Sequence, residues 1–351
     1  MVGPTRGDGR RTTGCGRLKP SGSRGRWYGS TDRARTHSGH QPHLPAEGLP
    51  ISDQRPDVSV AIVHYETPQL LLQCLEALRL AAERASTEVF VVDNHSSSFD
   101  QAACERAFHG VHVIRNDANV GFSKASNQAL RLARGRYLLL LNPDAFVEPD
   151  TLRAMVAFMD ERPEVGCATC RVELEDGSLD LACRRLFPTP ERSLYRMLLL
   201  SRIFPRSRRF GQYNLTYLND RQETEIDSPC GAFMMVRSEI REGVGLLDER
   251  YFMYGEDTDW AFRIKASGWH IVYTPITTVR HIKRASSRRD RSKTIGYFYE
   301  SMRIFYRAHY AAAYPRWISM AILAAIGVRE RFELLWARWK PQAAGLSRTE
   351  R

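Results

Sequence analysis

A run of five apolar residues that ends in Asn-Pro-Asp constrains the fold of this chain more than any other stretch. The run at 137–141 is too short for a helix and apolar at every position, which is typical of a central strand in a covered sheet. Pro143 cannot extend a strand ladder, so the strand ends at Asn142. Asn142 and Asp144 are therefore expected at the carboxyl end of that strand, where open α/β sheets bind ligands. Taken alone, the tripeptide also fits an ordinary polar turn.

Strands and helices alternate in the sequence that leads up to this run. β-rich runs are predicted at Val58–Val63, Glu88–Asp93 and Val111–Arg115, and helices that begin near Thr67, Phe99 and Ser123 separate them. Such alternation predicts a parallel sheet with right-handed crossovers. The first strand is not followed by Gly-x-Gly-x-x-Gly, and the sequence has no Walker lysine loop. This argues against a dehydrogenase and a P-loop NTPase, so side chains and a metal must hold the phosphates of any bound nucleotide.

The net charge of +11 is concentrated near the N-terminus. Residues 1–56 hold ten Lys/Arg against four Asp/Glu, are rich in Gly, Ser and Pro, and have almost no aliphatic periodicity. This predicts a disordered basic arm. Because the arm has no apolar signal-peptide core and no interleaved aromatic residues, we expect a cytoplasmic protein without specific nucleic-acid binding.

The seven cysteines are scattered through apolar segments, which predicts reduced thiols. Cys167 and Cys170 have the spacing of half a zinc site. A second Cys or His pair with ligand spacing does not follow them, so strand packing is the favoured interpretation.

Five motifs in a fixed order resemble those of family 2 glycosyltransferases, and the rhamnosyltransferase-like branch most of all. They are Val-Ala-Ile-Val-His-Tyr (60–65), Val-Val-Asp-Asn-His-Ser (91–96), Asn119–Asn127, Leu-Leu-Leu-Leu-Asn-Pro-Asp (138–144) and Tyr254–Trp260. The resemblance runs from about Val58 to Ile282. It implies a GT-A fold, a Rossmann-like and mostly parallel α/β sheet flanked by helices, over residues 57–290. The remainder, 291–351, is predicted to be a helical extension.

The resemblance also implies a site for a nucleotide diphosphate sugar, with dTDP or UDP as the carrier. Tyr65 and Asp93 contact the base, and Asp93 accepts its ring N–H. Asn119, Gly121 and Asn127 form the wall beside the ribose and the diphosphate.

A divalent metal, Mg²⁺ or Mn²⁺, is part of this prediction. The family's usual Asp-x-Asp is Asn142-Pro-Asp144 here, so only Asp144 offers a carboxylate, and we assign Asn142 to the nucleotide. His281 follows a predicted strand. A lone histidine there is more often structural, but in this fold a histidine at this point often completes the metal site. We favour His281 as the second ligand, because it compensates for the carboxylate that is missing at Asn142.

Three acids in Glu256-Asp257-Thr-Asp259 indicate the catalytic centre. Capping of a helix needs only one carboxylate, whereas general-base catalysis explains a cluster, because a sugar hydroxyl is a poor nucleophile near neutral pH. By the resemblance Asp257 is the base, and Glu256 is the second candidate. Trp260, one turn further on, either stacks against an acceptor sugar or belongs to the core. Gly231 and Ala232 either let a sugar approach the backbone or pack tightly.

Two further segments could take part in binding the acceptor, and the sequence allows two interpretations of each. Residues 187–225 are loop-rich and form either an acceptor region or a plain surface excursion. The twelve apolar residues of 317–328 cannot span a bilayer, which needs about twenty. They either lie at the inner face of the plasma membrane, where such enzymes often use lipid-linked acceptors, or pack on the domain.

The sequence therefore predicts an inverting glycosyltransferase. It moves a sugar, rhamnose by the resemblance, to a hydroxyl of a glycan or polyprenyl-linked acceptor. The alternative is an inactive nucleotide-sugar-binding regulator, in which the loss of a carboxylate at Asn142 has destroyed metal binding.

Overall fold

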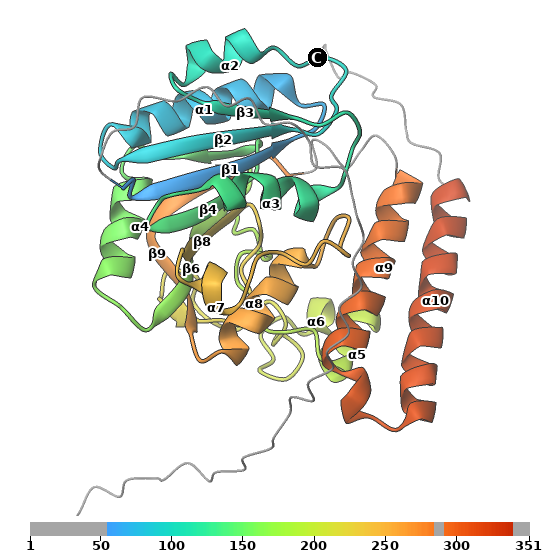
Figure 1. Cartoon of the computed structure of the whole chain (residues 1–351). Coiled ribbons are helices and arrows are strands. Elements are labelled where there is room, and N and C mark those ends of the chain that lie inside the picture. Colours follow the sequence, from blue (N-terminus) through green and yellow to red (C-terminus); the bar gives the residue numbers. More distant parts are fainter. Residues whose placement is uncertain (1–54, 284–290, 340–351) are drawn as a thin grey trace, which may run out of the picture. The chain divides into compact units, whose positions relative to one another are not determined.

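A nine-stranded mixed sheet forms the centre of the protein in a computed structural model that describes residues 55–283 and 291–339 (Figure 1). The spatial order is β3-β2-β1-β4-β8-β6-β9-β5, and β7 pairs with β9. The strands are β1 (Val58–His64), β2 (Thr87–Asp93), β3 (His112–Arg115), β4 (Tyr137–Leu141), β5 (Ala145–Val147), β6 (Val165–Glu173), β7 (Thr224–Glu225), β8 (Phe233–Arg237) and β9 (His270–His281).

The first half of the sheet is parallel, as predicted. β1 pairs in parallel with both β2 and β4, and β2 pairs in parallel with β3. Every residue of β4 is buried, which explains why all five positions are apolar. The carboxyl ends of these strands, which carry His64, Asp93 and Leu141, therefore lie along one edge of the sheet.

The second half reverses direction at β8, which is antiparallel to β4 and to β6. β9 runs parallel to β6, and the short β5 returns antiparallel along β9. Because of these reversals, the start of β8 and the ends of β6 and β9 join the edge formed by the ends of β1, β2 and β4.

Helices cover both faces of the sheet. α1 (Pro68–Ala82), α2 (Gln101–Ala107) and α4 (Thr151–Asp160) belong to one face, where α1 contacts the other two, while α3 (Phe122–Leu132), α7 (Ile240–Gly243) and α8 (Glu256–Ala266) cover the other (Figure 1). α1 shows how the sequence drives this packing. Leu71, Leu75 and Leu78 recur at helical spacing and are at most 1% exposed, and burial of each stabilises the fold by about 1.5–3 kcal/mol.

The structure corrects two predictions of secondary structure. The sequence of residues 179–183 predicts a strand after the Asp176-Gly177 turn, but in the structure Leu179 makes only an isolated bridge to Glu173, and turns follow it. The region 187–225 is not wholly irregular, because it contains α5 (Pro190–Met197) and α6 (Leu200–Ile203). Cys167 and Cys170 are fully buried in β6, so the packing interpretation of that pair is confirmed.

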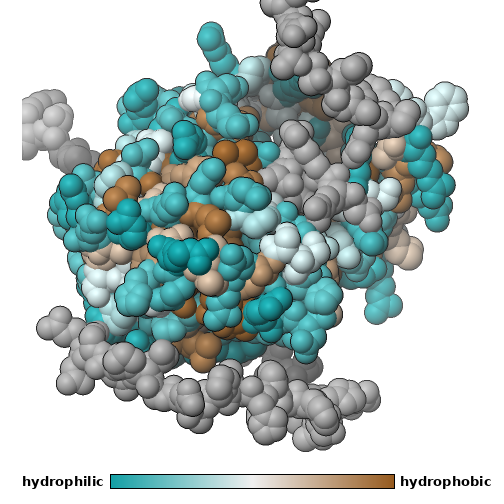
Figure 2. Space-filling model, turned by 90° about the horizontal axis from the view of Figure 1, so that it is seen from above, coloured by the Kyte–Doolittle hydropathy of each residue, from teal (hydrophilic) through white to brown (hydrophobic). Residues whose placement is uncertain are grey.

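The C-terminal extension is a pair of helices, α9 (Arg291–His309) and α10 (Arg316–Trp339), which are joined through a 3-10 turn at Ala311–Ala313. They pack against each other, and seen from above hydrophobic residues reach the surface where they lie (Figure 2). Within the described ranges, no helix is long and apolar enough to cross a bilayer. The predicted arm at 1–56 lies outside the described residues except for Arg55 and Pro56.

Candidate active site

Strand register brings Asp144 and His281 together. Ala145 at the start of β5 lies opposite His281 at the end of β9, so Asp144 is placed directly beside the imidazole. The distance from Asp144 Oδ1 to His281 Nε2 is 3.3 Å, and both residues are buried. Two residues from distant parts of the sequence thus meet at the edge where the parallel strands end.

A second carboxylate fixes the orientation of this imidazole. His281 Nδ1 lies 3.1 Å from Asp180 Oδ2, and Lys283 Nζ donates to Asp180 Oδ1 at 2.7 Å. Burial alone would raise the pKa of Asp180, but its hydrogen bonds with His281 and Lys283 hold it well below the usual range. Burial alone would likewise lower the pKa of His281, whereas hydrogen bonds with Asp144 and Asp180 raise it to about 9.

The Asp144–His281 pair fits a divalent cation. With Nδ1 held by Asp180, His281 presents Nε2 to the oxygen of Asp144, so one nitrogen and one carboxylate ligand converge. Carboxylates suit Mg²⁺ and Mn²⁺, and imidazole is a ligand of transition metals. Residues 55–283 and 291–339 hold no cluster of three or more His, Cys, Asp or Glu side chains arranged for a metal.

The second acid cluster begins helix α8. Asp257 Oδ2 accepts hydrogen bonds from Arg185 Nη2 at 2.8 Å and from the Gly231 N–H at 3.2 Å. Asp257 Oδ1 accepts from the backbone N–H of Thr258 at 2.6 Å and from its hydroxyl at 3.1 Å. Arg185 is half-buried, which lowers the pKa of its guanidinium, but the charge of Asp257 outweighs this effect and raises it. Asp257 is therefore a carboxylate that four hydrogen bonds hold in a fixed orientation.

Glu256 has a different environment although it is the next residue. It is 6% exposed, and its Oε2 is buried without a hydrogen-bond partner among the described residues. Burial and the charge of Asp257 together raise the pKa of Glu256 to about 8. A carboxyl group in such a place is protonated at neutral pH and able to donate a proton.

Cys230 and Gly231 connect the two clusters. These residues precede β8, and Asn142 N–H donates to the carbonyl of the next residue, Ala232, at 3.3 Å. Burial raises the pKa of Cys230 to about 11, and the charges of Asp180 and Asp257 both act on its thiol. The Asp144–His281 pair and the carboxylates of α8 therefore lie in one region of the sheet edge.

Gly231 also leaves room beside the second cluster. A Cβ atom there would meet only the Phe122 ring, at 3.8–3.9 Å. The alternative of tight packing at Gly231 is therefore wrong, and the space is bounded by a half-buried aromatic ring.

The residues predicted to bind the nucleotide lie at the predicted edge of the sheet, but they differ in how far they are buried. Tyr65 is half-buried directly after β1. Asp93 ends β2 but is fully buried: its Oδ1 lies 3.0 Å from His64 Nδ1, and its Oδ2 lies 3.6 Å from Arg115 Nε. Asn142 is half-buried beside Asp144. In this structure Asp93 is therefore not exposed, and both of its carboxylate oxygens already have partners.

Asn119 and Gly121 shape the loop before α3. Asn119 Oδ1 accepts from Asn94 Nδ2 at 2.9 Å and from the Gly121 N–H at 3.0 Å. Gly121 has φ +87°, and a Cβ there would come within 2.7 Å of the Phe252 carbonyl. Glycine is thus required by both the conformation and the close approach of the loop before α8.

Two predicted site residues are structural instead. Trp260 is fully buried and donates from Nε1 to the Gly245 carbonyl at 3.0 Å, so it is a core residue, and its assignment to the acceptor is wrong. Asn127 is 1% exposed, and its amide exchanges hydrogen bonds with the backbone of Leu247 at 2.9 and 3.1 Å. These bonds occupy its polar atoms, so Asn127 holds the loop after α7 rather than contacting a nucleotide.

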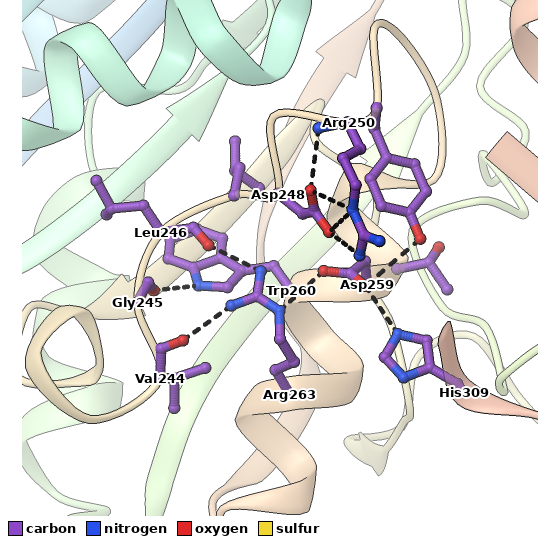
Figure 3. A network of polar contacts seen from close by, with 12 residues as sticks. Val244, Gly245, Leu246, Asp248, Arg250, Asp259, Trp260, Arg263 and His309 are labelled. Carbon is purple, nitrogen blue, oxygen red and sulfur yellow. Dashed lines mark hydrogen bonds and ion pairs between the residues drawn. The ribbon is translucent and has the colours of Figure 1, made fainter. Parts of the chain in front are cut away.

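A polar network holds α8 in place (Figure 3). Asp259 Oδ2 accepts from Arg263 Nε at 2.8 Å, and its Oδ1 lies 2.7 Å from His309 Nε2 of α9. Arg263 also donates to the carbonyls of Val244 and Leu246. The third acid of the cluster therefore joins α8 to the C-terminal extension and is not available for catalysis.

The sequence carries no signal that marks Asp180 and Arg185 as site residues. Asp180 follows the Asp176-Gly177 turn, in a stretch that was expected to be a strand. Arg185 is one of many arginines. Neither lies in a motif, and only the tertiary structure shows their contacts with His281 and Asp257.

The model of the family described as glycosyl transferase family 2 matches residues 59–242, more than half of the chain. The chain belongs to this family and is a glycosyltransferase. It is 26% identical over 260 residues to an N-acetylglucosaminyl-diphospho-decaprenol L-rhamnosyltransferase of Mycobacterium tuberculosis (strain ATCC 25618 / H37Rv), and the match covers 70% of this chain and 82% of the relative. It is also 24% identical over 251 residues to rhamnosyltransferase WbbL of Escherichia coli (strain K12), a match that covers 70% and 90% of the two chains.

Solved structures agree on the fold. The mannosyltransferase PcManGT from Pyrobaculum calidifontis, in complex with GDP-Man and Mn²⁺, superposes with a TM-score of 0.50 at 18% identity, over 86% of this chain and 80% of that one. Some structural relatives are longer, and the chain covers 45% of GalNAc-T7. The predicted GT-A fold is confirmed.

Proposed function

We propose that this glycosyltransferase is a metal-dependent inverting enzyme that transfers rhamnose or a related hexose from a nucleotide diphosphate sugar. The observation that carries the proposal is the meeting of Asp144 and His281 at the sheet edge, in the same region as Asp257. The relatives named as rhamnosyltransferases support the sugar, and the GDP-Man and Mn²⁺ complex of PcManGT supports the donor class and the metal.

Asp144 and His281 would hold the cation, and the carboxylate–imidazole donor set favours Mn²⁺ over Mg²⁺. When bound, the metal neutralises charge on the diphosphate as it leaves. His281 is held through Nδ1 by Asp180, so a cation that displaces the proton on Nε2 would meet an imidazole in a fixed orientation. Tyr65, Asn142 and the Asn119–Gly121 loop bind the nucleoside, and Asp93 accepts the ring N–H of the base once Arg115 has moved.

Asp257 deprotonates the acceptor hydroxyl, and the acceptor oxygen attacks the anomeric carbon as the bond to the diphosphate breaks. The nucleoside diphosphate leaves with the bonding electron pair, so a covalent sugar–enzyme intermediate is not formed. The incoming hydroxyl replaces the Thr258 hydroxyl on Oδ1, since this contact can rotate away while Arg185 and the backbone N–H groups stay. Glu256 is the alternative catalytic residue, and its protonated carboxyl would hydrogen-bond to the acceptor.

The acceptor in this proposal is a hydroxyl of a glycan or of a polyprenyl-linked sugar, and it enters beside Gly231 and Phe122. α10 presents Trp317, Val328 and Trp339, each at least 68% exposed, along its outer face. An apolar helix face with tryptophans at its ends suits peripheral contact with a membrane. This contact would place the enzyme at the inner face of the plasma membrane.

The proposal is tested with the purified full-length protein, Mn²⁺, a set of dTDP-, UDP- and GDP-sugars, and a polyprenyl diphosphate-linked N-acetylglucosamine. We expect one donor to give a glycosylated product whose anomeric configuration is inverted, as measured by NMR. Asp257→Asn should abolish transfer, and Asp176→Asn, on an exposed turn, is the matched control. Retention of configuration would contradict the mechanism. Donor binding without transfer or hydrolysis would favour the inactive regulator.

A further inference from the structure

The α5–α6 segment, Pro190–Phe210, exposes an unusual number of large apolar side chains. Neither of its two helices contains a buried residue. Five apolar side chains of the segment are between 50% and 62% exposed: Leu194, Leu198, Leu199, Ile203 and Phe204. Single exposed hydrophobic residues are common, but a group of this size within eleven positions marks an interaction surface.

The same segment is strongly basic. It contains six arginines and one acid, Glu191. That acid is occupied, because it hydrogen-bonds with Tyr195 and lies 3.6 Å from Arg209. Arg202, Arg206 and Arg208 are exposed and make no ion pair or side-chain hydrogen bond within residues 55–283 and 291–339. Apolar side chains and unneutralised cations therefore share one short surface element.

The segment starts at the active site. Arg185, the partner of Asp257, lies five residues before α5. Phe187 packs on Phe262 of α8 with ring centroids 4.9 Å apart, and Arg192 donates to the Phe187 carbonyl at 3.1 Å. The first turn of α5 is thus fixed to the helix that carries the proposed base, and the apolar residues lie further along the segment.

We propose that the α5–α6 segment docks on an anionic lipid bilayer. Its leucine, isoleucine and phenylalanine side chains enter the headgroup region, and its arginines bind the phosphates of anionic lipids. Docking through this segment would hold α8, which carries Asp257, close to the membrane surface. Delivery of a polyprenyl-linked acceptor by this route rests on the proposed function, whereas docking itself does not.

Charge argues against other occupants of this surface. A symmetric contact with a second copy would bring the same arginines together across a two-fold axis. The chain's own N-terminal 56 residues are also basic, so they do not complement the segment. A nucleic acid would satisfy the arginines but would leave Ile203 and Phe204 without apolar partners.

The test is co-sedimentation of the full-length protein with vesicles of phosphatidylglycerol and phosphatidylcholine, and with vesicles of phosphatidylcholine alone. The apolar variant is Ile203→Ser with Phe204→Ser, and the charge variant is Arg202→Gln with Arg206→Gln. Leu80→Ser with Leu132→Ser is the matched control, because these leucines are 42% and 43% exposed on α1 and α3. Thermal unfolding and solution mass are measured for every protein.

We expect the wild type to bind the anionic vesicles and the apolar variant to bind at least about ten-fold more weakly. Each removed arginine should weaken binding roughly five-fold, and added salt should reduce this difference. The control should remain within two-fold of the wild type. Unfolding temperatures should not change, since the altered side chains are not in the core.

Four results would overturn the inference: equal binding to neutral vesicles, unchanged binding of the apolar variant, equal loss in the control, or a change of the apolar variant from dimer to monomer. If only Trp317→Ser with Val328→Ser abolished binding, α10 would be the docking element instead. Donor binding is measured on the same preparations. Its absence would count against the proposed function, and it would leave the docking result standing.

Discussion

The two acid clusters at this sheet edge use their carboxylates in opposite ways. Asp144 has one side-chain partner within the described part of the chain, His281, whose ring is fixed from behind by Asp180. Asp257 is surrounded by four donor contacts, and Glu256 beside it leaves one oxygen unpartnered. The first cluster offers a carboxylate and an imidazole that fit a cation, whereas the second holds a carboxylate in a fixed orientation beside a carboxyl group whose pKa is raised. The proposed function therefore assigns metal binding and proton transfer to separate clusters on one edge.

Removal of the proposed base, Asp257, should have the largest effect. Asp257→Asn keeps the size and most hydrogen bonds of the side chain but cannot accept a proton, so the transfer rate should fall about 10²–10⁴-fold. Donor affinity, measured by calorimetry, should change little because the donor is held by the other cluster. Near-normal turnover would remove Asp257 from the mechanism and leave Glu256 as the candidate.

Loss of the Asp144 carboxylate should abolish metal binding at the first cluster, the Asp144–His281 pair. Without the carboxylate that faces His281 Nε2 the site should not retain the cation, so in Asp144→Ala the affinity for a nucleoside diphosphate should no longer depend on added Mn²⁺. Asn142→Ala is the control and should keep this metal dependence. If Asp144→Ala kept it too, the metal would have to bind elsewhere.

The orienting role of Asp180 can be separated from a structural one. His281→Ala should weaken Mn²⁺ binding about 10–100-fold, and Asp180→Asn should do so by a similar factor, because the imidazole loses its fixed tautomer. The measurement is the Mn²⁺ dissociation constant in the presence of nucleotide. A fall in thermal stability with unchanged Mn²⁺ affinity would make both residues structural.

The smallest predicted effect is that of Glu256 on how the free energy of unfolding depends on pH. Burial and Asp257 raise its pKa in the folded protein to about 8 from 4.5. The folded state therefore retains the proton, and the stability that Glu256 contributes is present below pH 4.5 and is lost as the pH rises to 8. Urea unfolding should show that the wild type loses roughly 2 kcal/mol or more relative to Glu256→Gln between pH 5 and pH 8.5. Parallel curves for the two proteins would show that Glu256 is ionised in the fold.

Sequence patterns located the strand-borne parts of the site well, because a strand fixes where its end lies. The apolar run before Asn142 and the run that ends in Asp93 placed both residues at the correct edge. The pairing of Asp144 with His281 required only that a later strand return to that edge.

Sequence patterns did not predict contacts made by loop residues, nor which face of a helix is buried. Trp260 lies on the helix of the base, but its indole is turned to the core, and helical spacing alone did not show which face is buried. Asp180 and Arg185 lie outside regular elements, so periodicity carried no signal for them. The two short helices of 187–225 contain no buried residue, and they therefore lack the pattern that would have predicted them.

The most direct test is the position of a metal in crystals grown with Mn²⁺ and a nucleoside diphosphate. The account predicts an anomalous peak within about 2.5 Å of both Asp144 Oδ1 and His281 Nε2, with Asp257 at the same edge facing the position of the transferred sugar. A Mn²⁺ ion bound to the nucleotide but to neither Asp144 nor His281 would contradict it.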